Sequence, residues 1–280
     1  MSLEEEVKRS IGLALMEDHV YHDTTTQSCF SPSSNARAQL VLKEEATIAA
    51  LRFLPWIFQA LDPLVKISLH AAEGERCPAG KTLATVEGKT WALLAAERTA
   101  VNLIQHATGI ATAAARYVEE IKGLDCEILD TRKTLPGLRH LQKYAVRLGG
   151  GVNHRFHLKE RILIKNNHLA LLKAENKNPI AAAITKARAA NPQAKIEIEV
   201  EDLTMIDQAL TAGADLILLD NMPPSLVKEA VALVQKRVYL EASGGITLSN
   251  VRAYAATGVA GVSIGALTHS VKAIDMSLRM

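Results

Sequence analysis

The chain has 280 residues, in which 32 lysines and arginines nearly balance 30 aspartates and glutamates. A dedicated nucleic-acid-binding protein usually has a large basic excess, so the net charge of +2 argues against that class. Hydrophobic residues make up 48% of the chain, which excludes intrinsic disorder, and no apolar run approaches the roughly 18 residues of a transmembrane helix.

The first ninety residues mix strand and helix patterns and predict a small α+β domain. Residues 38–44 alternate like a half-buried strand, and so do residues 82–86. Residues 48–61 predict a helix despite Pro55. The Ala-rich residues 91–121 then predict a long helix, in which Gly109 is a candidate break.

The pattern changes after residue 121, where six short β-rich runs alternate with helical segments. The runs are Glu127–Asp130, Ile162–Lys165, Ile196–Val200, Leu216–Asp220, Val238–Ala242 and Val262–Ile264. The clearest helical segments are Leu203–Ala212, Ser225–Gln235 and Ser249–Thr257. This alternation indicates parallel βα units, and continuously apolar runs are typical of a sheet covered on both faces. We expect an open α/β barrel; an open doubly wound sheet is the second choice, because no GxGxxG motif follows a strand.

The balanced total charge hides a local excess of cations. Residues 132–165 contain nine basic residues and one acid, a net charge of +8, and the remaining 246 residues carry −6. Such a concentration indicates a binding site for an anion, although a solvated basic helix face would explain it equally well.

Polar, charged or glycine residues stand at the end of every predicted strand. In α/β barrels the strand carboxyl ends meet at one face, where the active site lies. The ends read Asp130-Thr131-Arg132-Lys133, Lys165-Asn166-Asn167-His168, Glu197 to Glu201, Asp220-Asn221, Glu241 to Gly245, and Gly265-Ala266. Six such ends in register favour a shared site.

These side chains fall into three chemical groups. Arg132, Lys133, Arg155 and Lys165 are cations that suit carboxylates or phosphates. Glu199 and Asp220 are either ion-pair partners of those cations or ligands that position Mg²⁺, directly or through water. The small residues Ser243-Gly244-Gly245 and Gly265-Ala266 would let backbone N–H groups approach a phosphate.

Three other features have weaker functional interpretations. Gly149-Gly150-Gly151 follows a helical pattern, so a turn is favoured over a phosphate loop. His154 and His157 have HxxH spacing, but Arg155 and Lys159 beside them disfavour zinc. The three cysteines lie far apart, so we expect no disulfide framework, a reducing compartment and a cytoplasmic protein.

Several motifs together closely resemble the quinolinate phosphoribosyltransferase family. They are DTRKTLPGLRHLQKYAVRLGGGVNHRFHL (130–158), LIKNNH (163–168), AERTAVNLIQHATGIAT (96–112), IEIEVE (196–201), LILLDN (216–221), LEASGGI (240–246) and SIGALTHS (263–270). They cover most of residues 90–270 in order. Residues 14–26 resemble the N-terminal motif of the same family.

The resemblance implies a decarboxylating pentosyltransferase that requires Mg²⁺. Quinolinate and phosphoribosyl pyrophosphate would give nicotinate mononucleotide, pyrophosphate and CO₂, a step of de novo NAD biosynthesis. The implied architecture is an N-terminal α+β domain (1–105), an open α/β barrel (106–272) and a tail (273–280) that packs on the N-terminal domain. A homodimer or larger assembly is implied as well.

The resemblance also assigns roles to individual residues. Substrate binding falls to Arg98, Thr131, Arg132, His154, Arg155 and Lys165, with Arg98 entering the site of the partner subunit. Catalytic roles fall to Lys133, Glu199 and Asp220, of which the two acids also hold the metal. Phosphate binding falls to Ser243, Gly244, Gly245, Ile264, Gly265 and Ala266.

The sequence departs from the family pattern at His22, Leu135, Asn166 and Thr108, none of which is assigned to the chemistry. Three other functions stay open. They are nicotinate phosphoribosyl transfer without decarboxylation, a Schiff-base aldolase using Lys133 or Lys165, and a non-enzymatic RNA-binding protein. The scarce aromatic residues and the interleaved acids count against RNA binding.

Overall fold

A computed structural model describes residues 1–174 and 176–280. Contacts between residues divide the chain into two compact units. The first unit contains residues 1–115, 133–151 and 266–280, and the second contains residues 116–132 and 152–265. The domain boundaries expected from the sequence stay predictions.

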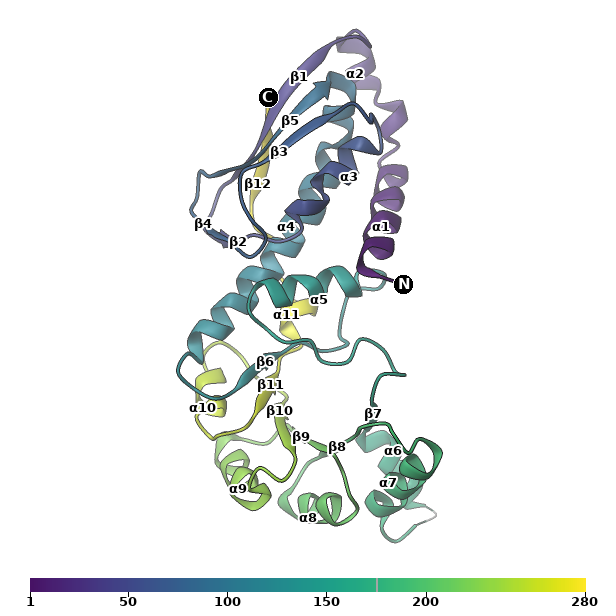
Figure 1. The fold of residues 1–280 in the computed structure, drawn as a ribbon, viewed down its shortest axis with the longest axis vertical. Coiled ribbons are helices and arrows are strands. Elements are labelled where there is room, and N and C mark those ends of the chain that lie inside the picture. Colours follow the sequence, from purple (N-terminus) through teal and green to yellow (C-terminus); the bar gives the residue numbers. More distant parts are fainter. Residues whose placement is uncertain (175) are drawn as a thin grey trace. The chain divides into compact units, whose positions relative to one another are not determined.

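The first unit is built on an antiparallel sheet with the strand order β12-β1-β5-β3 (Figure 1). The strands are β1 (Asn35–Leu42), β3 (Lys66–Leu69), β5 (Thr82–Lys89) and β12 (Met276–Arg279). A two-stranded sheet joins β2 (Ala46–Thr47) to β4 (Arg76–Cys77). Alternate apolar side chains of β1 and β5, such as Leu40 and Val86, are fully buried, as expected for a sheet with one face on the core.

Helices of the first unit pack around this sheet. They are α1 (Leu3–Glu17), α2 (Thr24–Cys29), α3 (Leu54–Gln59), α4 (Thr90–Glu120, whose last turn belongs to the second unit), α5 (Arg139–Leu148) and α11 (Ala266–His269), with short 3₁₀ turns at Val20–His22 and Leu51–Phe53. The expected helix over residues 48–61 was wrong at its start. Ala50 has a φ of 66°, which ends any regular helix there, and Pro55 occupies the first turn of α3, where its missing N–H costs nothing.

The predicted break in the long helix was also wrong, because α4 is continuous through Gly109. A Cβ atom at Gly109 would lie 2.3 Å from the main-chain oxygen of Lys272. Gly149 is similar, since its Cβ would lie 2.3 Å from the oxygen of Ala111 in α4. Both glycines therefore permit close packing of the backbone, and Gly149 ends α5.

The second unit is a six-stranded parallel sheet in the order β6-β11-β10-β9-β8-β7 (Figure 1). Its strands are β6 (Glu127–Leu129), β7 (Ile162–Ile164), β8 (Ile196–Val200), β9 (Leu216–Asp220), β10 (Tyr239–Ser243) and β11 (Gly261–Ser263). Each agrees with a predicted strand to within one residue at each end. Among the described residues β6 and β7 do not pair, so the sheet is an open α/β barrel, as expected.

Helices follow the strands of this barrel and cover its outer face (Figure 1). They are α6 (Asn166–Lys173), α7 (Pro179–Ala190), α8 (Leu203–Thr211), α9 (Pro224–Val234) and α10 (Val251–Ala255). Gly213 and Gly258 have positive φ angles just after α8 and α10, as predicted for helix ends. Across the described part of the chain, no helix has the length and apolar character needed to cross a membrane.

Candidate active site

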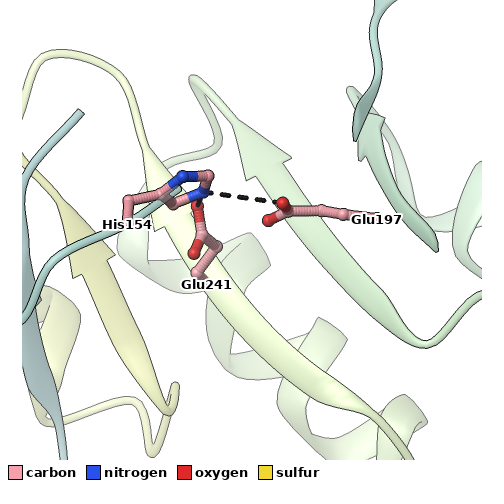
Figure 2. A group of neighbouring side chains, drawn as sticks. All are labelled: His154, Glu197 and Glu241. Atoms are coloured by element: carbon pink, nitrogen blue, oxygen red, sulfur yellow. Dashed lines mark ion pairs between the residues drawn. The ribbon is translucent and has the colours of Figure 1, made fainter. Parts of the chain in front are cut away.

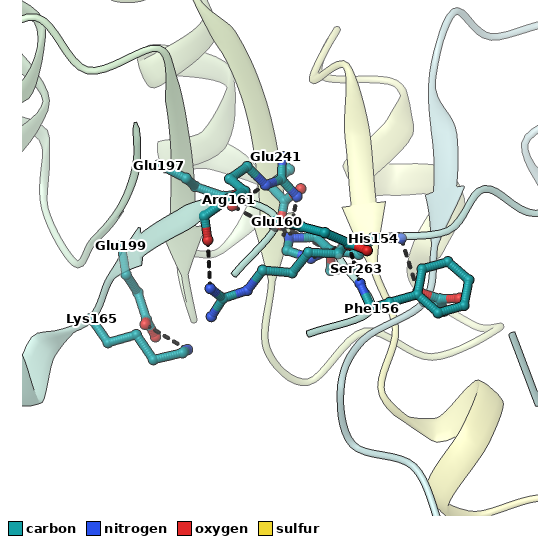
Figure 3. Close-up of polar contacts among 11 residues, drawn as sticks. His154, Phe156, Glu160, Arg161, Lys165, Glu197, Glu199, Glu241 and Ser263 are labelled. Atoms are coloured by element: carbon teal, nitrogen blue, oxygen red, sulfur yellow. Dashed lines mark hydrogen bonds and ion pairs between the residues drawn. The ribbon is translucent and has the colours of Figure 1, made fainter. Parts of the chain in front are cut away.

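Two carboxylates and a lysine meet at the carboxyl ends of the middle strands. Glu199 on β8 and Asp220 at the end of β9 bring their side-chain carboxylates together on neighbouring strands, closely enough that Glu199 raises the pKa of Asp220. Lys165, which follows β7, places Nζ 2.8 Å from Oε2 of Glu199 (Figure 3). Because parallel strands end at the same edge of the sheet, three residues far apart in the sequence form one polar group.

The acidic pair carries more negative charge than its lysine compensates. Burial raises the pKa of Asp220, and the charge and hydrogen bond of Glu199 raise it further, while Lys165 and Asn221 lower it. Carboxylate oxygens crowded in this way are the ligands that Mg²⁺ prefers, and a divalent cation would relieve their repulsion. The donor set therefore fits the metal expected from the sequence.

His154 and Arg155, on the segment between α5 and β7, are held beside the end of β6. Asp130 is fully buried and accepts hydrogen bonds from the main-chain N–H of His154 (2.9 Å) and the side-chain amide of Asn153 (2.6 Å). A single parallel β-bridge also joins Val152 to Leu129 of β6. These bonds anchor His154 and Arg155 beside the end of β6.

Arg155 is 8% exposed and is held so that part of its guanidinium has no protein acceptor. Nη1 donates to the main-chain oxygen of Arg161 at 2.8 Å, but buried Nε has no hydrogen-bond partner among the described residues. Burial lowers the pKa of Arg155, and the positive charge of Arg132 lowers it further. Two guanidinium groups that repel each other in this way make a site suited to an anion.

Beneath Arg155 lies a buried charged cluster formed by His154, Arg161, Glu197 and Glu241. Nε2 of His154 lies 3.5 Å from Glu197 and 3.4 Å from Glu241 (Figure 2). Nε of Arg161 lies 3.1 Å from Glu197, and Ser263 donates to Glu241 at 3.0 Å (Figure 3). Of these residues the sequence assigned a binding role to His154 alone.

The loop after β10 depends on two glycines. Gly244 has a φ of 99°, and a Cβ atom there would lie 2.1 Å from Oδ1 of Asn221. The N–H of Asn221 donates to the oxygen of Ser243 at 2.8 Å, which ties the ends of β9 and β10 together. Gly245 also has a positive φ, of 61°. The predicted phosphate loop is thus a tight turn shaped for glycine, and Asn221 is a neighbour that the sequence did not single out.

The structure brings most of the predicted site residues into the second unit. Thr131 and Arg132 follow β6, and Ile264 and Gly265 follow β11, where the N–H of Ile264 donates to Leu129. Lys133, Arg98 and Ala266 belong to the first unit. Arg98 is exposed on α4, and the main-chain oxygen of Lys133 accepts a hydrogen bond from Thr268 at 2.7 Å.

Three of the four departures from the family pattern lie at accessible positions, and the fourth, Thr108, is fully buried. Asn166 donates to Glu201 at 2.6 Å, a contact in which an acid would meet a like charge. Leu135 is 43% exposed and His22 is exposed as well. None of the three contacts the acidic pair or Arg155 through a described hydrogen bond.

Comparison with known proteins identifies the family. Residues 23–108 match the N-terminal domain of quinolinate phosphoribosyl transferase, and residues 110–279 match its C-terminal domain. The chain belongs to the quinolinate phosphoribosyltransferase family.

Similar proteins span nearly the whole chain. A probable nicotinate-nucleotide pyrophosphorylase (carboxylating) of Bacillus subtilis is 41% identical over 98% of this chain and 93% of its own. The Mycobacterium leprae nicotinate-nucleotide pyrophosphorylase (carboxylating) is 41% identical, with coverage of 96% and 95%. The solved structure of the Francisella tularensis nicotinate-nucleotide pyrophosphorylase is 36% identical, with a TM-score of 0.91 and coverage of 98% and 96%.

Proposed function

We propose that the protein transfers phosphoribosyl from phosphoribosyl pyrophosphate to quinolinate with decarboxylation. The products are nicotinate mononucleotide, pyrophosphate and CO₂, and the reaction belongs to de novo NAD biosynthesis. Membership of the quinolinate phosphoribosyltransferase family supports this activity. The structural observation that carries it is the buried Arg155 guanidinium, with Nε unpaired and Arg132 nearby, because a dicarboxylate would supply the missing acceptors.

The acidic pair suits the transfer step. The pyridine nitrogen of quinolinate attacks the anomeric carbon of the ribose while pyrophosphate leaves, and positive charge develops on the ribose ring. Glu199 and Asp220 stabilise that charge, and Lys133 neutralises the departing pyrophosphate. The nitrogen carries no proton, so no general base is needed.

Mg²⁺ is the proposed cofactor, held by Glu199 and Asp220 directly or through water. When bound, it neutralises phosphate charge in the reactants. The crowding of the two carboxylates, which raises the pKa of Asp220, supports a cation site here. Ser243, Gly244, Gly245, Ile264, Gly265 and Ala266 would hold the phosphates through main-chain N–H groups.

Decarboxylation follows from the product of the transfer. Once the ring nitrogen is a pyridinium, its positive charge stabilises the carbanion that remains on the adjacent carbon when the carboxylate leaves as CO₂. A proton from solvent then completes the C–H bond, so no organic cofactor is required. Thr131, Arg132, His154, Arg155 and Lys165, with Arg98, orient the substrate and determine which carboxylate is lost. The number of these cations favours a dicarboxylate over nicotinate.

One coupled assay tests this function. Purified protein with Mg²⁺, quinolinate and phosphoribosyl pyrophosphate should release CO₂ and pyrophosphate in equal amounts. Pyrophosphate release from nicotinate without CO₂ would instead support the non-decarboxylating transferase. Borohydride trapping of a carbonyl substrate on a lysine would support the aldolase, and RNA binding with a steep salt dependence would support the third alternative.

We further propose a cytoplasmic homodimer, or a larger assembly built from dimers, in which Arg98 enters the site of the partner subunit. The exposure of Arg98 on α4 supports the exchange, and the unpaired state of all three cysteines supports a reducing compartment. Arg98→Ala and Lys165→Ala should each be inactive alone. Refolded together in equal amounts, they should regain about a quarter of wild-type activity, because half of the dimers have one intact site. No recovery would contradict the exchange.

A further inference from the structure

The buried charged cluster beneath Arg155 has a composition that suits neither a simple core nor a metal site. Glu197 is fully buried and Glu241 is 1% exposed. Oε2 of Glu241 and both oxygens of Glu197 lack a hydrogen-bond partner among the described residues, although Glu197 forms an ion pair with Arg161. Buried carboxylates are costly unless cations compensate them, so their presence requires a reason.

A metal ion does not supply that reason. His154, Glu197 and Glu241 could in principle form a three-ligand set. The guanidinium of Arg161 already lies among them, however, with Nε 3.1 Å from Glu197 and Nη2 2.9 Å from Nε2 of His154. A cationic side chain at that position excludes a dication.

The charges in the cluster instead couple it to His154. Two carboxylates face one guanidinium, so the group carries a net negative charge while His154 is neutral, the state in which Nδ1 accepts the N–H of Arg155. The His154 ring is contacted by Glu197 of β8, by Glu241 of β10, and by Arg161 and Arg155 of its own segment. Two further groups act indirectly: Asp130 accepts the main-chain N–H of His154, and Ser263 of β11 donates to Glu241. Burial lowers the pKa of His154, but the two glutamates outweigh burial and leave the pKa raised.

The same cluster also controls the position of Arg155. The Arg161 side chain is fixed by Glu197, and its main-chain oxygen accepts the hydrogen bond from Nη1 of Arg155. The main-chain N–H of Arg155 donates a hydrogen bond to Nδ1 of His154 at 2.9 Å. A displacement of Arg161 or of the His154 ring would therefore move the guanidinium whose Nε is unpaired.

We infer that Glu197, Glu241 and Arg161 are positioning residues that hold His154 and Arg155 in the geometry that binds the carboxylates of the acceptor substrate. This inference rests on the proposed function, because it takes His154 and Arg155 as quinolinate-binding groups. None of the three touches the substrate; each acts through the two residues that do.

The test compares Glu197→Gln, Glu241→Gln and Arg161→Met with wild type in steady-state kinetics. KM for quinolinate should rise about tenfold or more in each variant, because a misplaced His154 or Arg155 would bind the quinolinate carboxylates more weakly. KM for phosphoribosyl pyrophosphate should stay within about twofold, since the described ion pairs of Glu197, Glu241 and Arg161 run to one another and to His154 and not to Glu199, Asp220 or the glycine loop. Arg161→Lys, which keeps the charge, should recover part of the loss.

Coupling between residues gives a second readout, which a general loss of stability would not produce. If Glu197 acts through Arg161, the double variant Glu197→Gln/Arg161→Met should raise KM for quinolinate no more than the worse single variant. The matched control is Glu119→Gln, an exposed glutamate of the second unit that pairs with Lys122, and it should behave as wild type. If Glu197→Gln does not fold, Glu241→Gln provides the same comparison.

The outcomes separate this inference from the function. Wild-type protein that releases no CO₂ and pyrophosphate from quinolinate overturns the proposed function and the inference with it. An active wild type whose three variants keep KM for quinolinate within twofold overturns the inference alone. The inference is also overturned if both KM values and the melting temperature shift together, because that pattern reports structural damage.

Discussion

At the scale of single residues, the candidate site brings together like charges that a bound anion would balance. Arg155 is buried next to Arg132, and burial and that neighbouring charge both lower its pKa. Lys165 is the side chain that pairs with the acidic group, through Glu199. Each cation thus lies in one part of the site, and its removal should weaken substrate binding more than it destabilises the fold.

Arg132→Ala and Lys165→Ala should therefore remove quinolinate turnover while the fold stays intact. Hydrogen bonds to charged groups are usually worth about 1.5–3 kcal/mol, so kcat/KM should fall by at least about tenfold in each variant. The coupled assay measures turnover, and circular dichroism verifies the fold. Near-normal turnover in both purified variants would contradict the site assignment.

His154 also predicts a pH dependence of stability. Its pKa is raised in the folded protein, so its ion pairs stabilise the fold fully below the unfolded value of about 6.5 and are lost as the pH rises through the raised pKa. The difference in free energy of unfolding between wild type and His154→Gln should be largest near pH 6 and smaller at pH 9. Urea unfolding at both values measures it, and a difference that grows with pH would be the opposite result.

At the scale of elements, the loop after β10 illustrates how tightly two strand ends are joined. Gly244 leaves no room for a side chain because Oδ1 of Asn221 occupies the position of a Cβ atom. Gly245, the next residue, has a positive φ but nothing within 4 Å of such an atom. Two adjacent glycines therefore have different reasons to be glycine, and they form a matched pair for substitution.

Gly244→Ala should displace Asn221 and raise KM for phosphoribosyl pyrophosphate, and it should also lower stability. Gly245→Ala should cost only the left-handed backbone strain of about 1–2 kcal/mol, with a much smaller effect on that KM. Steady-state kinetics and thermal unfolding of the two variants make the comparison. Equal effects on KM would mean that the contact with Asn221 does not shape the phosphate loop.

At the scale of the whole molecule, the first unit is assembled from three separated stretches of chain. Strand β12 pairs with β1 from Gln39↔Arg279 to Leu42↔Met276, although the entire second unit lies between them in the sequence. Leu278 and Met276 are buried there. The sheet of the first unit is therefore complete only when β12 is in place.

Removing residues 276–280 should destabilise the protein and promote aggregation. The deletion exposes the hydrogen-bonding edge of β1 and the apolar side chains beneath Met276 and Leu278. We expect a lower melting temperature and larger species in size-exclusion chromatography. Removal of Met280 alone, which is 59% exposed and lies outside β12, is the control and should change neither measurement.

The barrel was predictable from sequence because its strands follow a simple rule. A sheet covered on both faces favours continuous apolar runs, and Leu216–Asp220 is such a run up to its last residue. Ile196–Val200 alternates with Glu197 and Glu199, but its β-branched residues still indicated a strand, and both runs matched the strands residue for residue. The motifs at the strand ends then identified the family. Local patterns failed where distant packing decided the outcome, as at Gly109, whose close neighbour Lys272 lies far away in the chain.

Part of the candidate site was beyond sequence reasoning for a related reason. The sequence placed Glu197 and Glu241 among the polar strand ends of a shared site but gave neither a role of its own, and it counted Arg161 as one cation among nine. The three residues form ion pairs only because β8, β10 and the segment before β7 lie together in the fold, and no local sequence pattern encodes that contact. The alternation of Glu197 with Glu199 on one strand was the available signal, since both project from the same face.

The pairing of β12 with β1 also affects folding during synthesis, because β12 is made long after β1. Roughly 230 residues separate the two strands, so at ~5–20 residues per second a ribosome needs roughly 10 to 50 s to make β12 after β1 has formed. Throughout that interval the outer edge of β1 is open to strand addition from another nascent chain. Arg37, an exposed charged side chain of this strand just before the stretch that β12 covers, is the kind of residue that discourages such pairing.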